Sequence, residues 1–264
     1  MLARPERATG ATVPVAELRN ASLAFGSKVI LANFSLAIPA GRKISVVGES
    51  SSGKSSLLKV LIGLIPPDRG ELYLFGRDFR KIHLRDREKI RRRVGTQFQA
   101  GALFDSMNVR ENLSLAKYES SRGRQKVDPR SLSGEIQDLL SAVGLGKAGL
   151  LNPASLSGGM RKRAAIARAL IGNPELAVFD EPTAGLDPLT SGAIIHLLNS
   201  LSRDSGAAMV LATSDVDIAR RFSEDIVIFH QGRIWARGSL DEHLASPDPY
   251  IQRFLARHKR LRAR

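Results

Sequence analysis

The sequence predicts an α/β fold with a mainly parallel, buried sheet, a small antiparallel β part near the N-terminus and an inserted helical lobe. A short apolar strand runs into a glycine-rich loop that precedes a helical run. After residue 160, apolar runs alternate with helical runs, which favours parallel strands joined by helices. Between residues 100 and 156 the apolar residues instead have helical spacing, which indicates a separate lobe.

Runs rich in apolar and β-branched residues predict the strands of the N-terminal third. These strands cover residues 16–25, 29–38, 43–47, 71–75 and 94–99. A helix is expected over residues 54–64, where Pro66 and Pro67 stop it, and a basic helix over residues 84–93.

The lobe contains two helical runs, residues 109–117 and 135–143. The polar stretch between them, residues 119–133, is expected to be a loop. The alternation that follows predicts helices and strands in turn, at residues 160–171, 176–179, 188–201, 208–212 and 226–229.

The composition is that of a globular chain with one core. Of 264 residues, 43% are hydrophobic and 25% charged. No apolar run approaches the ~20 residues that span a bilayer, so any transport pore must come from another chain. The absence of cysteine excludes disulfides and thiolate metal sites. Residues 1–14 lack the apolar core of a secretion signal and are expected to form a short flexible arm.

The chain is strongly basic, with a net charge of +14 and a pI near 10.7. Such a charge attracts nucleotides, nucleic acid or acidic lipid surfaces. The cations gather in residues 89–93, in residues 161–163 and in a basic C-terminal tail, residues 245–264. Each block alone is best interpreted as a solvated face; contact of the tail with anionic headgroups is the alternative.

The glycine-rich loop fits the P-loop pattern G-x-x-x-x-G-K-[ST]. Its backbone N–H groups can curl around phosphate oxygens, and the following helix adds its positive N-terminal dipole. Lys54 would reach the β- and γ-phosphates, and the Ser55 hydroxyl would ligate Mg²⁺. The alternative, a serine-rich turn, does not explain the placement between strand and helix. The candidate phosphate-binding residues are Gly48, Glu49, Ser50, Ser51, Ser52, Gly53, Lys54, Ser55 and Ser56.

Two carboxylates end the strand at residues 176–179. Ligands of open α/β sheets bind at this carboxyl edge. Asp180 would hold the Mg²⁺ shell, and Glu181 would orient and deprotonate the attacking water. A polar strand end leading to the Pro182 turn is the alternative, but the upstream P-loop argues against it.

A second anion-binding nest precedes the helix at residues 160–171. It combines two glycines, a hydroxyl and a helix N-terminus. Its residues are Leu156, Ser157, Gly158, Gly159 and Met160. A helix N-cap with a glycine turn is the alternative. One nucleotide hardly needs two such nests from one chain.

In this order, the three motifs resemble the ATP-binding subunits of ABC transporters. The resemblance implies an ABC cassette with a RecA-like core, ATP and Mg²⁺ as cofactors, and a head-to-tail homodimer in which residues 156–160 cap the partner's ATP. Gln99 matches the Q-loop glutamine that touches Mg²⁺, although Gln97 competes for that role. Phe25 matches the adenine-stacking aromatic, with a core position as the alternative. Asp187 matches the D-loop at the dimer seam.

Three positions depart from this family pattern. Ser51 stands where a glycine is frequent, and Met160 where a glutamine is commoner. Ser214 occupies the position of the histidine that contacts the γ-phosphate. A serine reaches less far and binds phosphate more weakly. We therefore expect slowed turnover with intact ATP binding.

Finer features resemble the ATPases of Mla/Mce-type lipid transport systems. They include residues 98–113, the nest with its Arg-rich continuation, and residues 246–255. The resemblance places the ATPase domain at residues 15–244, with the lobe at about 100–160. It implies a membrane permease, an Mce-domain lipid-binding subunit and a small regulatory subunit as partners, and phospholipid as cargo. The location would be peripheral, at the cytoplasmic face of the inner membrane.

Two rival functions remain open from the sequence. An ATP-gated switch with weak hydrolysis is suggested by Ser214, but Glu181 argues against it, since a dead site needs no catalytic base. A non-transport ABC ATPase acting on nucleic acid is suggested by the charge. The single cassette, the short lobe and the lack of interleaved aromatic and basic residues argue against that rival, so we expect no nucleic acid partner.

Overall fold

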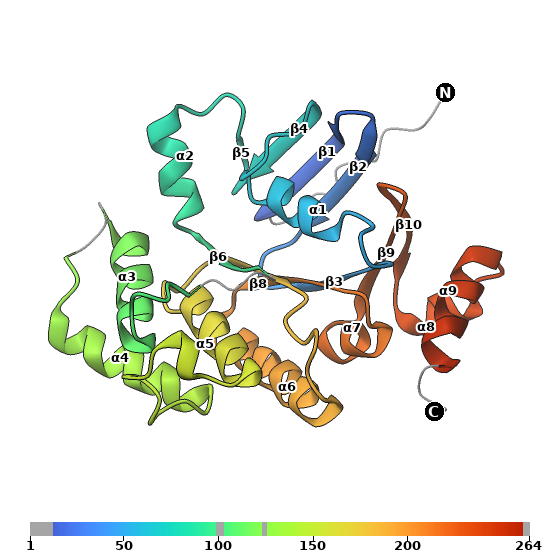
Figure 1. The fold of residues 1–264 in the computed structure, drawn as a ribbon. Coiled ribbons are helices and arrows are strands. Elements are labelled where there is room, and N and C mark those ends of the chain that lie inside the picture. The colour runs from blue at the N-terminus through green and yellow to red at the C-terminus, as the bar shows by residue number, and fades with distance from the viewer. Residues whose placement is uncertain (1–12, 99–102, 123–125, 261–264) are drawn as a thin grey trace.

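A six-stranded sheet forms the centre of the protein, seen in a computed structural model that describes residues 13–98, 103–122 and 126–260 (Figure 1). Its strand order is β10-β9-β3-β8-β7-β6. β3, β6, β7, β8 and β9 run parallel, and β10 pairs antiparallel with β9. The bounds are β3 Lys43–Val47, β6 Val94–Gln97, β7 Leu176–Asp180, β8 Ala208–Thr213, β9 Asp225–His230 and β10 Arg233–Gly238. The predicted mainly parallel sheet is confirmed.

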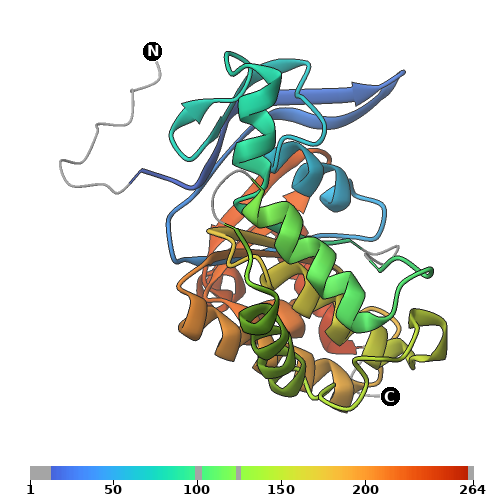
Figure 2. The ribbon, with the colours of Figure 1, turned by 90° about the vertical axis from the view of Figure 1, so that its left-hand side faces the viewer.

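The N-terminal third also forms an antiparallel sheet with the order β2-β1-β4-β5. Its strands are β1 Ala16–Phe25, β2 Lys28–Ile38, β4 Arg69–Leu74 and β5 Arg77–Asp78. The helix α2, Leu84–Arg91, leads from this part back to β6. Figures 1 and 2 show the antiparallel sheet and α2 on one side of the central sheet.

Side-chain alternation along the central strands divides the core into two layers. Val178 and Val210 face α1 (Lys54–Leu61) and the antiparallel sheet. Their strand neighbours Phe179 and Leu211 face the opposite layer. The helices of that layer are α5 Gly158–Leu170, α6 Pro188–Ser205 and α7 Val216–Phe222. No helix among the described residues is long and apolar enough to cross a membrane.

The helical lobe contains α3 (Val109–Ser121), α4 (Pro129–Ala142) and a short 3₁₀ turn (Pro153–Ser155), packed on α5 (Figure 2). The loop expected over residues 119–133 is wrong at both ends. The α3 helix continues to Ser121, and α4 begins at Pro129. Asp128 caps α4 by accepting a hydrogen bond from the Ser131 N–H. Pro at the first helical position is a start signal that the polar composition obscured.

The C-terminal segment is helical and packed, not a solvated tail. After α8 (Leu240–Ala245), α9 (Pro249–Arg260) lies against the β9 side of the sheet (Figure 1). Ile251, Phe254 and Leu255 are buried there with Val47 and Ile228. Their i, i+3, i+4 spacing makes one apolar stripe on an otherwise basic helix. Residues 1–12 of the expected arm and 261–264 lie outside the described residues.

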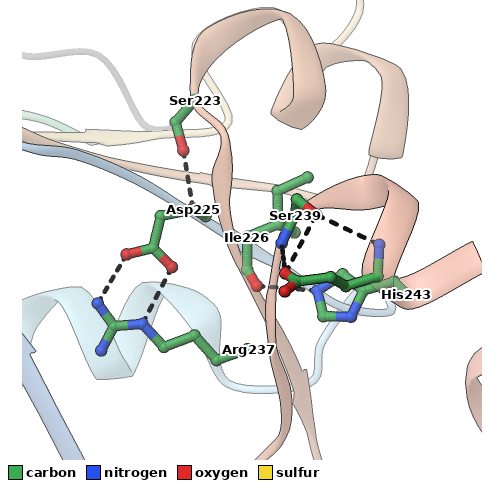
Figure 3. Close-up of polar contacts among 7 residues, drawn as sticks. Ser223, Asp225, Ile226, Arg237, Ser239 and His243 are labelled. Carbon is green, nitrogen blue, oxygen red and sulfur yellow. Dashed lines mark hydrogen bonds and ion pairs between the residues drawn. The ribbon is translucent and has the colours of Figure 1, made fainter. Parts of the chain in front are cut away.

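A polar corner ties α8 and β10 to β9 (Figure 3). Arg237 donates two hydrogen bonds to the Asp225 carboxylate, at 3.0 and 2.6 Å. The buried His243 ring lies 3.0 Å from the Ile226 carbonyl oxygen through its Nε2 atom. At the start of α8, the Ser239 hydroxyl oxygen accepts a hydrogen bond from the Glu242 N–H. The Glu242 carboxylate in turn accepts one from the Ser239 N–H. These contacts fix the start of the chain segment that leads into α9.

Candidate nucleotide site

The parallel strands β3, β7 and β8 deliver three polar segments to one edge of the sheet. β3 leads into the P-loop, β7 ends at Asp180 and β8 at Thr213. A cavity of about 430 Å³ opens at this edge. Its lining residues are Lys28, Ile30, Ser50, Ser51, Gly53, Lys54, Ser55, Ser56, Glu181, Ala184 and Ser214. Residues far apart in the sequence thus meet in one cavity.

The backbone of the P-loop shows why two of its positions are glycine. A Cβ on Gly48 would collide with the Phe229 carbonyl oxygen. Gly53 has a φ of 103° and immediately precedes α1. Ser51 also takes a left-handed conformation, with φ 62°. Glycine adopts this left-handed backbone conformation at a lower conformational cost than serine, which agrees with the glycine that is frequent at the position of Ser51.

Lys54 is buried inside the loop, with 5% of its surface exposed. Its Nζ donates hydrogen bonds to the carbonyl oxygens of Gly48 at 2.9 Å and Glu49 at 3.0 Å. The same atom lies 3.5 Å from Glu181 Oε1. The loop therefore holds its ammonium group at the cavity wall, where a phosphate can take the place of the carboxylate.

Glu181 has a left-handed backbone, with φ 48°, directly after β7. Thr213 Oγ1 donates a hydrogen bond of 3.3 Å to its Oε2. Lys162 on α5 donates to the Glu181 carbonyl oxygen at 3.2 Å and to that of Ala184. Burial lowers the pKa of Lys162, which Glu181 partly offsets. Lys162 was not singled out from the sequence, because the basic block at 161–163 was interpreted as solvated.

Asp180 is the buried carboxylate of the site, with 2% of its surface exposed. Burial raises its pKa, and the Ser55 hydroxyl opposes that shift. Among the described residues its Oδ1 has no hydrogen-bond partner. Mg²⁺ prefers one or two carboxylate or hydroxyl ligands and completes its shell with water and phosphate. The open Oδ1 beside Ser55 fits that ion.

Phe25 and Gln99 are the two contacts expected at the edge of the site, and the structure describes only the first of them. Phe25 is 51% exposed, so the alternative of a core phenylalanine is wrong. It pairs across the β1–β2 turn with Lys28, which lines the cavity. Gln99 lies outside the described residues. Its competitor Gln97 is buried in β6 and donates to the Phe98 carbonyl oxygen at 3.2 Å.

The second nest forms the N-terminus of α5. Ser157 Oγ accepts a hydrogen bond of 3.3 Å from the Met160 N–H, and Gly158 is exposed. Leu156 is buried in the lobe core of its own chain. Within the described part of the chain, none of residues 156–160 lines the P-loop cavity. One chain does not bring the two nests together.

Asp187 caps α6 beside this nest. Its Oδ1 accepts a hydrogen bond of 3.0 Å from the Thr190 N–H, and these bonds to Thr190 lower the pKa of the carboxyl group. A Cβ on Gly159 would come within 3.1 Å of Thr190. The start of α5 and the start of α6 therefore form one continuous surface.

Comparison with known proteins gives consistent matches. The family model described as "ABC transporter" matches residues 31–184. The chain is 35% identical to the intermembrane phospholipid transport system ATP-binding protein MlaF of Escherichia coli (strain K12), over 90% of this chain and 87% of that protein. It is also 35% identical to protein TRIGALACTOSYLDIACYLGLYCEROL 3 of Arabidopsis thaliana, over 90% and 72%.

A relative whose name specifies a different cargo also matches, and so does a solved structure. The methionine import ATP-binding protein MetN of Mesorhizobium japonicum is 34% identical over 96% of this chain and 67% of that protein. A dimeric bacterial ABC transporter cassette superposes with a TM-score of 0.77 at 31% identity, covering 85% of this chain and 98% of that one.

Proposed function

This chain belongs to the ABC transporter family as an ATP-hydrolysing subunit, and we propose that it drives the movement of phospholipid or a related lipid between membranes through a separate permease. The observation that carries the motor function is the single cavity that gathers Lys54, Ser55, Glu181 and Ser214, with Asp180 behind it. The lipid cargo is supported by the two relatives whose names specify lipids.

In the proposed reaction, the residues around the cavity act on ATP from their observed places. The P-loop N–H groups and Lys54 bind the β- and γ-phosphates. Asp180 and Ser55 would hold Mg²⁺, which supplies charge neutralisation at the phosphates. Glu181 orients the attacking water and accepts its proton. Phe25 would stack on the adenine, and Gln99 would sense the metal-bound phosphate.

A dimer completes this site. The nest at residues 156–160 is an anion-binding surface that its own chain leaves apart from the P-loop cavity. We propose that Ser157 and Gly158 cap the ATP of a second copy, with Asp187 at the seam. The dimeric form of a solved relative supports this arrangement.

A surface beside the lobe offers a contact for the permease. The Asn112 side chain pins the loop before α3, because it accepts a hydrogen bond from the Phe104 N–H at 2.7 Å and donates to its carbonyl oxygen at 3.1 Å. The Phe104 ring remains 48% exposed. Arg168 lies 5.2 Å from that ring centroid. A fixed, exposed aromatic is typical of an anchor at a protein interface.

The rest of the assembly follows from the same proposal. The chain would sit at the cytoplasmic face of the inner membrane, with an Mce-domain lipid-binding subunit and a small regulatory subunit in the complex. The name of the Escherichia coli relative, which specifies an intermembrane phospholipid transport system, supports an assembly at membranes. Methionine, the cargo named for another relative at 34% identity, is the competing substrate.

The cargo is tested by capturing the native complex. A Glu181→Gln variant, with hydrolysis blocked, retains ATP and so holds the dimer and its permease together. We expect mass spectrometry of the purified complex to find co-purified phospholipid above the level in a Lys54→Ala control. The wild-type complex in vesicles should then hydrolyse ATP faster with phospholipid in the donor membrane. Stimulation by methionine and not by lipid would overturn the proposed cargo.

A further inference from the structure

An ion pair joins the C-terminal helix to the phosphate loop across 208 sequence positions. Arg257 Nη1 on α9 donates a hydrogen bond of 2.7 Å to Glu49 Oε1. Glu49 is the second residue of the P-loop. The sequence motif fixes no residue type at that position, so nothing in the motif anticipates its partner.

The helix that carries Arg257 is held firmly at this place. Its apolar stripe, with Phe254 and Leu255, is buried with Val47, the residue directly before Gly48. The preceding polar corner around His243 and Arg237 fixes the segment that enters α9 (Figure 3). The position of Arg257 is therefore set by packing, and not by the ion pair alone.

Aromatic contacts add a second link between α9 and the end of β9. The Tyr250 ring lies on the His230 ring with centroids 3.9 Å apart, and Trp235 packs against both. Burial raises the pKa of Tyr250, and the Glu49 charge adds to that shift.

Glu49 contacts both α9 and Lys54. Its carboxylate faces Arg257, while its carbonyl oxygen accepts a hydrogen bond of 3.0 Å from Lys54 Nζ. A carboxylate in a loop that binds a polyanion repels the phosphates unless a cation neutralises it. Arg257 supplies that cation and keeps the side chain turned toward α9.

We propose that Arg257 is a positioning residue for ATP binding, which acts by neutralising and orienting Glu49 so that the P-loop accepts the triphosphate. The inference rests on ATP binding at the cavity and is independent of the cargo. It makes the docking of α9 part of the nucleotide site. By thermodynamic linkage, ATP binding and the seating of α9 favour each other.

The test is equilibrium binding of ATP with Mg²⁺ to the full chain carrying Glu181→Gln, so that no hydrolysis occurs. In that background we expect Arg257→Gln to raise the Kd for ATP about 2- to 5-fold, because exposed ion pairs are individually weak. In the wild-type background the same change should raise KM and leave kcat within about 1.5-fold, as expected for uniform binding.

Three further variants separate positioning from a general structural effect. Arg257→Lys keeps the charge and should restore most of the affinity. Arg253→Gln, one turn earlier, removes an arginine that, among the described residues, donates its hydrogen bond to the Pro249 carbonyl oxygen of its own helix. This change should leave the Kd unchanged. Glu49→Gln removes the charge that Arg257 compensates, so adding Arg257→Gln to it should have no further effect.

Failure of the role proposed for Arg257 can be distinguished from failure of the proposed ATPase function. An unchanged Kd in Arg257→Gln, or the same loss in the Glu49→Gln background, would overturn the inference while leaving ATP hydrolysis by the wild-type chain intact. Higher salt should shrink the difference between wild type and Arg257→Gln, because exposed charges are screened. An undiminished difference at high salt would also contradict the role proposed for the ion pair.

Discussion

Lys54 Nζ lies 3.5 Å from Glu181 Oε1 in the cavity. The buried lysine also donates hydrogen bonds to two loop carbonyl oxygens, and its charge acts on Asp180 as well. A γ-phosphate entering the cavity would compete for the same ammonium group. ATP binding would therefore release Glu181 toward water at the moment when a base is needed.

The serine at the family's histidine position is expected to limit the rate. Ser214 lines the cavity, but a neutral hydroxyl makes weaker bonds to phosphate than a longer side chain that can carry a positive charge. We expect Ser214→His to raise kcat about 10-fold with ATP affinity changed less than about 3-fold. Steady-state ATPase assays on the assembled complex measure both. A variant no faster than wild type would show that Ser214 does not slow turnover.

The buried charge of Asp180 lowers the free energy of unfolding. Its pKa is raised above the ordinary 3.8 by burial, so the folded protein binds a proton more readily than the unfolded chain. The free energy of unfolding therefore falls as pH rises from 3.8 to the folded pKa, and stays lowered above it. Asp180→Asn removes this penalty. We expect a Tm higher by about 2–5 °C at neutral pH without nucleotide.

Thermal unfolding with and without ATP and Mg²⁺ completes that test. The wild-type protein should gain stability when Mg²⁺ is added to ATP, while Asp180→Asn should lose this metal-dependent part. Asp128→Asn is a suitable control, because Asp128 is an exposed helix cap of the lobe outside the cavity. A lower Tm for Asp180→Asn in the absence of ligand would contradict the assigned cost of burying the charge.

Phe25 is predicted to bind the adenine ring. Because its side chain is half-exposed at the β1–β2 turn, Phe25→Ala should leave the folded state almost as stable as wild type. Base stacking is worth about 1–3 kcal/mol, so the Kd for ATP should rise about 5- to 150-fold. Val29→Ala, at an exposed position of the same hairpin, is the matched control. Equal affinities for Phe25→Ala and wild type would remove Phe25 from the site.

The fold of the nucleotide core could be predicted because strand periodicity and motif spacing are local signals. The strand at 43–47, the P-loop and the two carboxylates at the end of β7 all have the predicted positions. The role of Lys162 could not be predicted in the same way. Its contacts with the carbonyl oxygens of Glu181 and Ala184 depend on how α5 packs on the loop after β7. The charge of Lys162 alone predicts a solvated side chain.

The packing of the C-terminal segment is not predictable from the sequence for a related reason. Six basic residues from Arg253 onward dominate its composition and suggested a solvated tail. Only the burial of Ile251 and Phe254 against β9 reveals a packed helix. The apolar spacing was present in the sequence, but its partner surface comes from strands about 25 and 200 positions away. Tertiary packing decided the outcome.

Phe104 is predicted to couple ATP hydrolysis to the permease. Phe104→Asp should leave the ATPase rate of the isolated chain within about 2-fold, because Phe104 does not line the cavity. In vesicles with the complete complex it should reduce lipid movement more than about 10-fold, since a charge replaces an aromatic anchor. Leu84→Asp, an equally conspicuous exposed hydrophobic on α2, should have little effect on transport. Undiminished transport by Phe104→Asp would rule the contact out.

The ATPase rate of the purified chain with Mg²⁺, measured for wild type and Glu181→Gln side by side, tests the central claim most directly. The change leaves size and hydrogen bonding nearly intact but removes the base. We predict measurable hydrolysis by wild type, a loss of about 100-fold or more in the variant, and ATP binding retained by both. Equal hydrolysis by the two proteins would contradict the assignment of Glu181 and, with it, the proposed mechanism of the site.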